Sequence, residues 1–204
     1  MKRLITIVLC MLPLLATAQQ KPLTANDVLR QFLSKIDGET LNASFVLTVT
    51  QDATQPLSYT GQLKMRGNCF RLKMLGNEGA YDGKTYYMYS EDTDELTLTT
   101  PTPQELLEAN PILFARELQR KSSVRFSAAN KDPKRYVIEL VPNNQTAGVQ
   151  KFVITLQKSG FVPEKIEVKE SAQSTVLRFQ DAGFSAQIPS FVVSKPGAFV
   201  NDLR

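Results

Sequence analysis

The chain has 204 residues, with 24 Lys and Arg against 20 Asp and Glu, a formal net charge of +4 and no histidine. The lack of histidine excludes Ser-His and Cys-His activation of a nucleophile and the commonest zinc ligands, so we expect no enzyme, no metal site and no cofactor. The basic residues are scattered along the whole chain rather than clustered, which argues against a protein that binds nucleic acid.

The N-terminus has the organisation of a signal peptide. Lys2 and Arg3 form a positive start, residues 4–15 are almost entirely apolar, and Ala16-Thr17-Ala18 provides the small residues of a cleavage site. The apolar run is shorter than the roughly 20 residues that a membrane-spanning helix needs. We therefore expect residues 1–18 to be removed before Gln19, and residues 19–204 to form a single exported domain.

An amphipathic helix is expected near the start of the mature chain. Thr24 followed by Asp27 has the spacing of a capping box, and Gly38 is placed to end the helix. Between these positions the apolar residues recur at helical spacing: Val28, Leu29, Phe32, Leu33 and Ile36. One side of this helix is therefore expected to pack on an apolar surface.

From residue 42 onward the apolar residues recur at every second position, which is typical of strands with one apolar and one solvated face. The residues on this apolar phase are Phe45, Leu47, Val49, Leu63, Met65, Phe70, Leu72 and Met74, followed by Tyr87, Tyr89, Leu96 and Leu98. The alternation resumes later in five segments, at residues 124–128, 136–141, 150–156, 165–170 and 175–179. The total is about ten strands, and an antiparallel sheet of that size tends to curl or close.

The middle of the chain, residues 101–121, breaks this alternation. A short helical centre is expected between Pro101 and Pro111, and a second short helix over residues 112–121. The apolar residues available there to cover the mouth of a curled sheet are Leu106, Leu107, Ile112 and Leu113. The expected fold class is α+β, a curled antiparallel sheet covered by an N-terminal helix and a short helical lid.

Several motifs follow one another along the mature chain. They are Asn42-Ala43-Ser44-Phe45, Gly61-Gln62-Leu63-Lys64-Met65-Arg66, Phe70-Arg71, Asp82-Gly83-Lys84-Thr85 and Asn110-Pro111-Ile112-Leu113-Phe114, with a tail over residues 191–202. In this order, and after a signal peptide, they resemble the LolA family, the periplasmic carriers of outer-membrane lipoproteins. The resemblance extends over nearly the whole mature chain.

The resemblance implies a fold, a cargo and a set of partners. The fold is an incomplete β-barrel whose apolar interior holds acyl chains, so the residues of the apolar phase given above would line an acyl-chain cavity. The cargo is an acylated lipoprotein, taken from an inner-membrane ABC transporter and passed to an outer-membrane acceptor across the periplasm. We expect the carrier to be a monomer.

The resemblance also implies a closing mechanism. Leu106, Leu107, Ile112 and Leu113 would belong to the lid over the cavity. A strand arginine of the family holds the lid closed when the cavity is empty. Its nearest counterpart here is Arg66, with Arg71 as a competing candidate.

Other interpretations stay open at this point. The chain could be an envelope module of the same fold that binds a protein, or another lipid-linked molecule, without transporting lipoproteins. It could also be a carboxylate-based hydrolase, although no motif supports that function. Finally, the apolar strand faces could form a sealed core rather than an accessible cavity.

Overall fold

The computed structural model of the chain describes residues 22–51, 55–143 and 148–204. The expected signal peptide, residues 1–18, and its cleavage site before Gln19 lie outside the described residues. The helices are α1 (Ala25–Gly38), α2 (Pro103–Ala109) and α3 (Pro111–Lys121). The strands are β1 (Thr40–Gln51), β2 (Leu57–Arg66), β3 (Cys69–Met74), β4 (Asn77–Tyr81), β5 (Tyr86–Ser90), β6 (Glu95–Thr99), β7 (Ser122–Phe126), β8 (Arg135–Pro142), β9 (Val149–Gln157), β10 (Pro163–Glu170), β11 (Gln173–Ser185) and β12 (Phe199–Asp202). In the part of the chain described, no helix combines the length and apolar character needed to cross a membrane.

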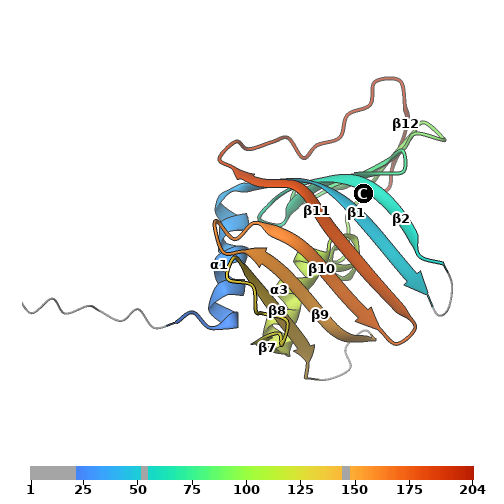
Figure 1. Cartoon of the computed structure of the whole chain (residues 1–204). Helices are drawn as coiled ribbons and strands as arrows, with labels where there is room; N and C mark the ends of the chain where they lie inside the picture. Colours follow the sequence, from blue (N-terminus) through green and yellow to red (C-terminus); the bar gives the residue numbers. More distant parts are fainter. Residues whose placement is uncertain (1–21, 52–54, 144–147) are drawn as a thin grey trace, which may run out of the picture.

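The strands form one 12-stranded sheet in the order β12-β6-β5-β4-β3-β2-β1-β11-β10-β9-β8-β7. All neighbouring pairs are antiparallel except β12 and β6, which run parallel. Among the described strands, β7 and β12 remain as unpaired edges, so the sheet curls without closing. In Figure 1 it curves around α3. The prediction of an α+β fold with a curled antiparallel sheet is confirmed.

Two strands, β4 and β12, were absent from the prediction of about ten. β4 has the sequence Asn-Glu-Gly-Ala-Tyr, which lacks both β-branched residues and a clear apolar alternation. Gly79 in its centre lies beside Tyr86 of β5, where an added Cβ would come within 2.8 Å of the tyrosine hydroxyl. β12 is only four residues long and depends on its pairing with the distant strand β6.

The N-terminal helix α1 forms as its capping box predicts. The Thr24 hydroxyl accepts a hydrogen bond from the Asp27 amide at 3.1 Å, and the Asp27 carboxylate accepts one from the Thr24 amide at 3.1 Å. The apolar stripe that contains Phe32 is buried against the sheet. At the other end of the helix, the Ile36 carbonyl accepts a hydrogen bond from the Gly67 amide at 2.8 Å, which ties α1 to the β2–β3 turn.

The two middle helices differ in how they are held. α3 buries Ile112, Leu113, Ala115 and Leu118, whereas α2 has no fully buried residue. Asn110 separates the helices in an extended conformation, with φ −145° and ψ 109°, as the following proline favours. Its side chain caps α3 by accepting hydrogen bonds from the Ile112 amide at 2.9 Å and the Leu113 amide at 3.4 Å.

The sheet has apolar clusters on both of its faces. We call the face toward the helices the inner face; it carries the main core, together with α1 and α3. The opposite, outer face carries a smaller cluster made by Ala80, Tyr87, Leu96, Leu98 and Val193, with Tyr89 and Ala198 packed against it. Val193 and Ala198 belong to the segment between β11 and β12, which Figure 1 shows returning across the sheet.

Candidate functional site

A cavity of about 630 Å³ lies between the inner face of the sheet and the α2–α3 region, and we call it the inner cavity. Its size is within the range of small-molecule binding sites. Most of its surface is apolar and comes from strands on both halves of the sheet. The lining residues are Phe45, Leu47, Leu63, Leu72, Met74, Tyr86, Gln104, Leu107, Glu108, Ala109, Asn110, Pro111, Phe114, Val149, Ile166, Val168, Glu170, Thr175 and Leu177.

Five residues of the expected acyl-chain cavity line the inner cavity together: Phe45, Leu47, Leu63, Leu72 and Met74. They come from β1, β2 and β3, where antiparallel pairing places Leu63 opposite Leu72 and Phe45 opposite Gly61. Gly61 makes room for the Phe45 ring, because an added Cβ would lie 2.3 Å from that ring and 2.6 Å from the Lys73 carbonyl oxygen.

Three more expected lining residues lie near the cavity but outside its surface. Met65 and Phe70 are 0% and 1% exposed and belong to the main core. The Met65 sulfur accepts a hydrogen bond from the Asn110 Nδ2 at 3.5 Å, so it supports the junction between α2 and α3. Val49 is partly buried further along β1 and does not line the cavity.

The structure corrects the placement of Tyr87, Tyr89, Leu96 and Leu98, which lie in the outer-face cluster rather than in the cavity. The pleat of β5 sends neighbouring side chains to opposite faces, and it is Tyr86 that reaches the inner cavity. On the outer face the Tyr87 hydroxyl donates to the Asp82 carboxylate at 2.9 Å. The Tyr89 hydroxyl donates to the Asp94 carboxylate at 3.0 Å.

Sequence reasoning missed the part of the lining that β9, β10 and β11 provide. Ile166, Val168 and Leu177 line the inner cavity, as does Phe114 of α3. A signal for the three strand residues was present, because they alternate with the charged residues Lys165, Glu167 and Arg178.

The expected lid residues divide between two roles. Leu107 of α2 lines the inner cavity, and Leu106 of α2 packs against the main core while remaining partly exposed. Ile112 and Leu113 of α3 are 0% and 6% exposed and form part of the core itself. The residues that face the cavity from the start of α3 are instead Pro111 and Phe114.

Polar contacts fix α3 to α1. The Arg116 guanidinium donates to both carboxylate oxygens of Asp37, at 2.8 and 3.2 Å, and the Gln119 side-chain amide donates to Asn26 at 2.9 Å. The side-chain hydrogen bonds of α2 are local, such as that from Gln104 to Glu108 at 2.9 Å. Among the described residues, α2 thus has less buried surface and fewer tertiary hydrogen bonds than α3.

Neither candidate latch arginine bonds to α2 or α3 within the part of the chain that the structure describes. The Arg66 guanidinium donates to the Ala186 carbonyl at 3.3 Å, which ties β2 to the segment after β11. Arg71 pairs with Glu78 on the outer face, because it alternates with the inward residues Phe70 and Leu72. The latch role expected for these arginines therefore has no supporting bond among the described residues.

Glu78 is the most buried acidic side chain of the outer face, with 2% of its surface exposed. Burial alone would raise its pKa, but hydrogen bonds from Arg71 and Lys195 hold the pKa below its usual value. Lys195, 3.1 Å from the carboxylate, belongs to the segment between β11 and β12. This ion pair therefore helps to fix that segment over the outer cluster.

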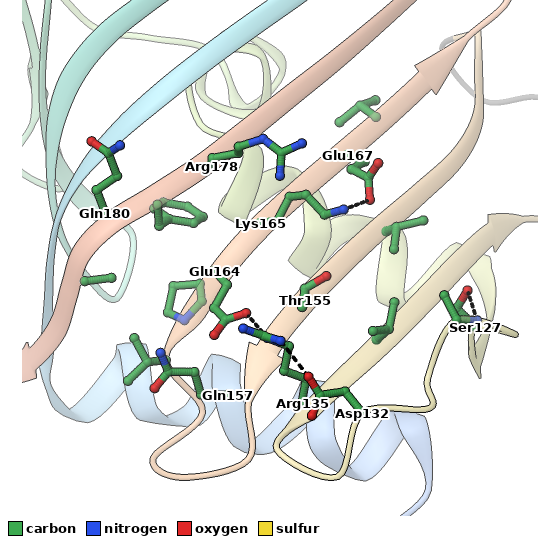
Figure 2. A pocket seen from close by; sticks show the side chains of 18 of the residues that line it. Ser127, Asp132, Arg135, Thr155, Gln157, Glu164, Lys165, Glu167, Arg178 and Gln180 are labelled. Carbon is green, nitrogen blue, oxygen red and sulfur yellow. Dashed lines mark hydrogen bonds and ion pairs between the residues drawn. The ribbon is translucent and has the colours of Figure 1, made fainter.

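A second hollow, of about 1020 Å³, lies on the outer face over β8–β11, and we call it the outer groove. Figure 2 shows its charged side chains, with Arg135 bridging Asp132 and Glu164. Lys165 pairs with Glu167 at 2.7 Å beside Arg178. Such a densely charged surface is costly to dehydrate, so the outer groove is a poor site for an acyl chain.

Comparisons with known proteins agree with this arrangement. The family profile described as "Outer membrane lipoprotein carrier protein LolA" matches residues 15–172. An outer-membrane lipoprotein carrier protein from Photorhabdus laumondii is 26% identical over 194 residues, covering 88% of this chain and 89% of the relative.

Solved structures share the fold at low sequence identity. An uncharacterized conserved protein from Thermus thermophilus superposes with a TM-score of 0.57 at 10% identity, covering 85% of this chain and 96% of that one. The Mycobacterium tuberculosis lipoprotein LppX gives a TM-score of 0.50 at 10% identity, covering 82% and 98%.

Proposed function

The chain belongs to the family of the outer membrane lipoprotein carrier protein LolA, and from this membership we propose that it carries lipoproteins across the periplasm. The acyl chains bind in the inner cavity during the passage from the inner to the outer membrane. The observation that supports this proposal most directly is the apolar inner cavity, which is partly covered by helix α2, a helix with no fully buried residue.

The energetics of an acyl chain require such a cavity. Burying one methylene group is worth roughly 0.8 kcal/mol, so a sixteen-carbon chain gains on the order of 12 kcal/mol when it leaves water. A carrier must hold the chain that strongly and still release it. The sequence has no P-loop pattern for ATP binding. Release therefore depends on a conformational change and on partners, for which an inner-membrane ABC transporter and an outer-membrane acceptor are the expected donor and recipient.

Opening of α2 would supply the conformational change. Swinging α2 away exposes Leu106 and Leu107 but leaves α3 held by Arg116 and by its buried side chains. Such an element lets cargo shift the population between closed and open forms, provided that the two differ by only a few kcal/mol.

Two experiments test the proposal. The mature protein, exported from cells by its own N-terminal segment, is extracted with organic solvent, and its lipids and lipoproteins are identified by mass spectrometry. A second assay measures the release of a labelled lipoprotein from inner-membrane vesicles into the soluble fraction. We expect acylated cargo in the first and stoichiometric release in the second. A stable protein partner without any lipid would instead indicate a binding module of the same fold.

A further inference from the structure

The solvent-accessible part of the inner cavity lining carries acidic side chains. Most lining residues are apolar, and the exposed or half-exposed polar ones are Gln104 and Glu108 on α2 and Glu170 and Thr175 on β10 and β11. None of the described residues that line the cavity is Lys or Arg. We call this solvent-accessible part of the lining the mouth; it carries two carboxylates, Glu108 and Glu170, next to an apolar interior.

Neither carboxylate has a basic partner among the described residues. Glu108 accepts a hydrogen bond from the neutral side chain of Gln104 at 2.9 Å. Over residues 22–51, 55–143 and 148–204, the ion pairs include neither Glu108 nor Glu170. Helix α2 itself contains two acidic residues and no basic one.

The basic residues of the adjacent strands face away from the cavity. Lys165 and Lys169 of β10 alternate with the inward residues Ile166 and Val168, and Arg178 of β11 follows the inward residue Leu177. Lys165, Lys169 and Arg178 all line the outer groove, where Figure 2 shows the side chains of Lys165 and Arg178. The sheet thus separates these cations from the carboxylates at the mouth.

We propose, on the basis of the proposed function, that Glu108 and Glu170 select the head group of the cargo. An acyl chain that enters the inner cavity leaves its head group at the mouth, beside both carboxylates. An anionic head group is repelled there by the two carboxylates, to an extent that salt reduces. A neutral or cationic group is accepted.

This selection distinguishes the cargo from the competing amphiphiles of a membrane. Fatty acids carry a carboxylate directly on the chain, and anionic phospholipids carry a net negative head group. Acyl chains joined to a peptide through amide or ester bonds have no charge at the linkage. The ligand class of the mouth is therefore an acyl chain on a neutral or cationic group, which fits an acylated peptide and disfavours free fatty acids and anionic phospholipids.

Three probes with the same twelve-carbon chain test this selection: dodecyltrimethylammonium, N-dodecylacetamide and dodecanoate. The affinity of each probe is measured by displacement of a fluorescent acyl reporter from the mature protein. The titrations are done at low salt, with each probe below its critical micelle concentration. We expect the cationic probe to bind about tenfold tighter than the anionic probe, with the preference shrinking as salt is added. In the double variant Glu108→Gln and Glu170→Gln the ratio of the affinities for the cationic and anionic probes should fall to about one.

The control is Glu91→Gln, which removes one exposed carboxylate away from the inner cavity and should keep the wild-type preference. The neutral probe reports on folding, because only an intact cavity binds it. Equal affinities for the charged probes in the wild type, or an undiminished preference in the double variant, would overturn the selection while leaving the carrier function in place. Failure of all three probes to bind would overturn the carrier function as well.

Discussion

A glutamate in the wall of the inner cavity should abolish acyl-chain binding while the protein stays folded. Leu47 is the best position, because it lines the inner cavity yet is only partly buried, whereas Leu63 is 4% exposed. In the empty Leu47→Glu variant the carboxylate can keep water in the cavity, so we expect a loss of stability of no more than about 2 kcal/mol. The Leu63→Glu variant would place a charge in close packing and unfold the protein.

The effect on binding should be much larger than the effect on stability. An acyl chain that fills the cavity of Leu47→Glu displaces the water around the introduced carboxylate, which costs at least about 3 kcal/mol, or more than about 100-fold in Kd. The matched control is Val46→Glu, because Val46 is the next residue of β1 and its antiparallel partner on β11 is Arg178. That carboxylate lies on the outer face near a cation and should leave binding unchanged.

The assay is titration of a fluorescent fatty acyl amide, with urea unfolding of each variant measured in parallel. We expect wild type and Val46→Glu to bind alike, and Leu47→Glu to be folded but unable to bind. The reasoning is refuted if wild type binds no acyl probe and Leu47→Glu unfolds, because the space would then be sealed core rather than a cavity.

Five further predictions concern α2, three side chains and the N-terminus. Hydrogen exchange should be faster in α2 than in α3, and Asn110→Ala should lower the unfolding free energy in urea by about 1–2 kcal/mol through loss of the α3 cap. Arg71→Leu should destabilise the protein in urea without changing the rate of cargo transfer, since its partner Glu78 lies on the outer face; slower transfer at unchanged stability would contradict this. Because the folded-state pKa of Glu78 is lowered, its contribution to stability is present above its unfolded pKa of about 4.3 and is lost as the pH falls through the folded pKa. Below about pH 5, the unfolding free energy of Glu78→Gln should therefore fall less steeply with decreasing pH than that of the wild type. The exported protein should begin at Gln19, which its intact mass would show, and a retained N-terminal segment would exclude the expected cleavage.

The sequence was most informative where local chemistry decides the structure. The capping box at Thr24 and the stripe around Phe32 specify α1 without reference to the rest of the chain. Period-two alternation likewise placed Phe45, Leu47 and Leu63 together on the inner face. In these segments the favourable local conformation and the burial of apolar surface agree, so a single sequence is enough to predict them.

The errors arose where distant segments decide which face is buried. Tyr86 and Tyr87 are adjacent, equally suited to a strand and both aromatic, so their sequence does not reveal which one faces inward. That choice depends on Val193, far along the chain, which covers the outer side of β5. Arg71 was misplaced for a similar reason, since its partner Glu78 lies on a strand that the apolar pattern did not predict.

Gly61 fixes the position of one wall residue of the inner cavity, the Phe45 ring. Because an added Cβ would lie 2.3 Å from the Phe45 ring and 2.6 Å from the Lys73 carbonyl oxygen, any side chain there must push the ring into the cavity or separate β2 from β3. Gly61 therefore affects the shape of the inner cavity although it does not itself line the cavity. If acyl chains bind in the inner cavity, Gly61→Ala should shorten the longest chain accepted while leaving the affinity for short chains intact, as a series of probes from about eight to about eighteen carbons would measure.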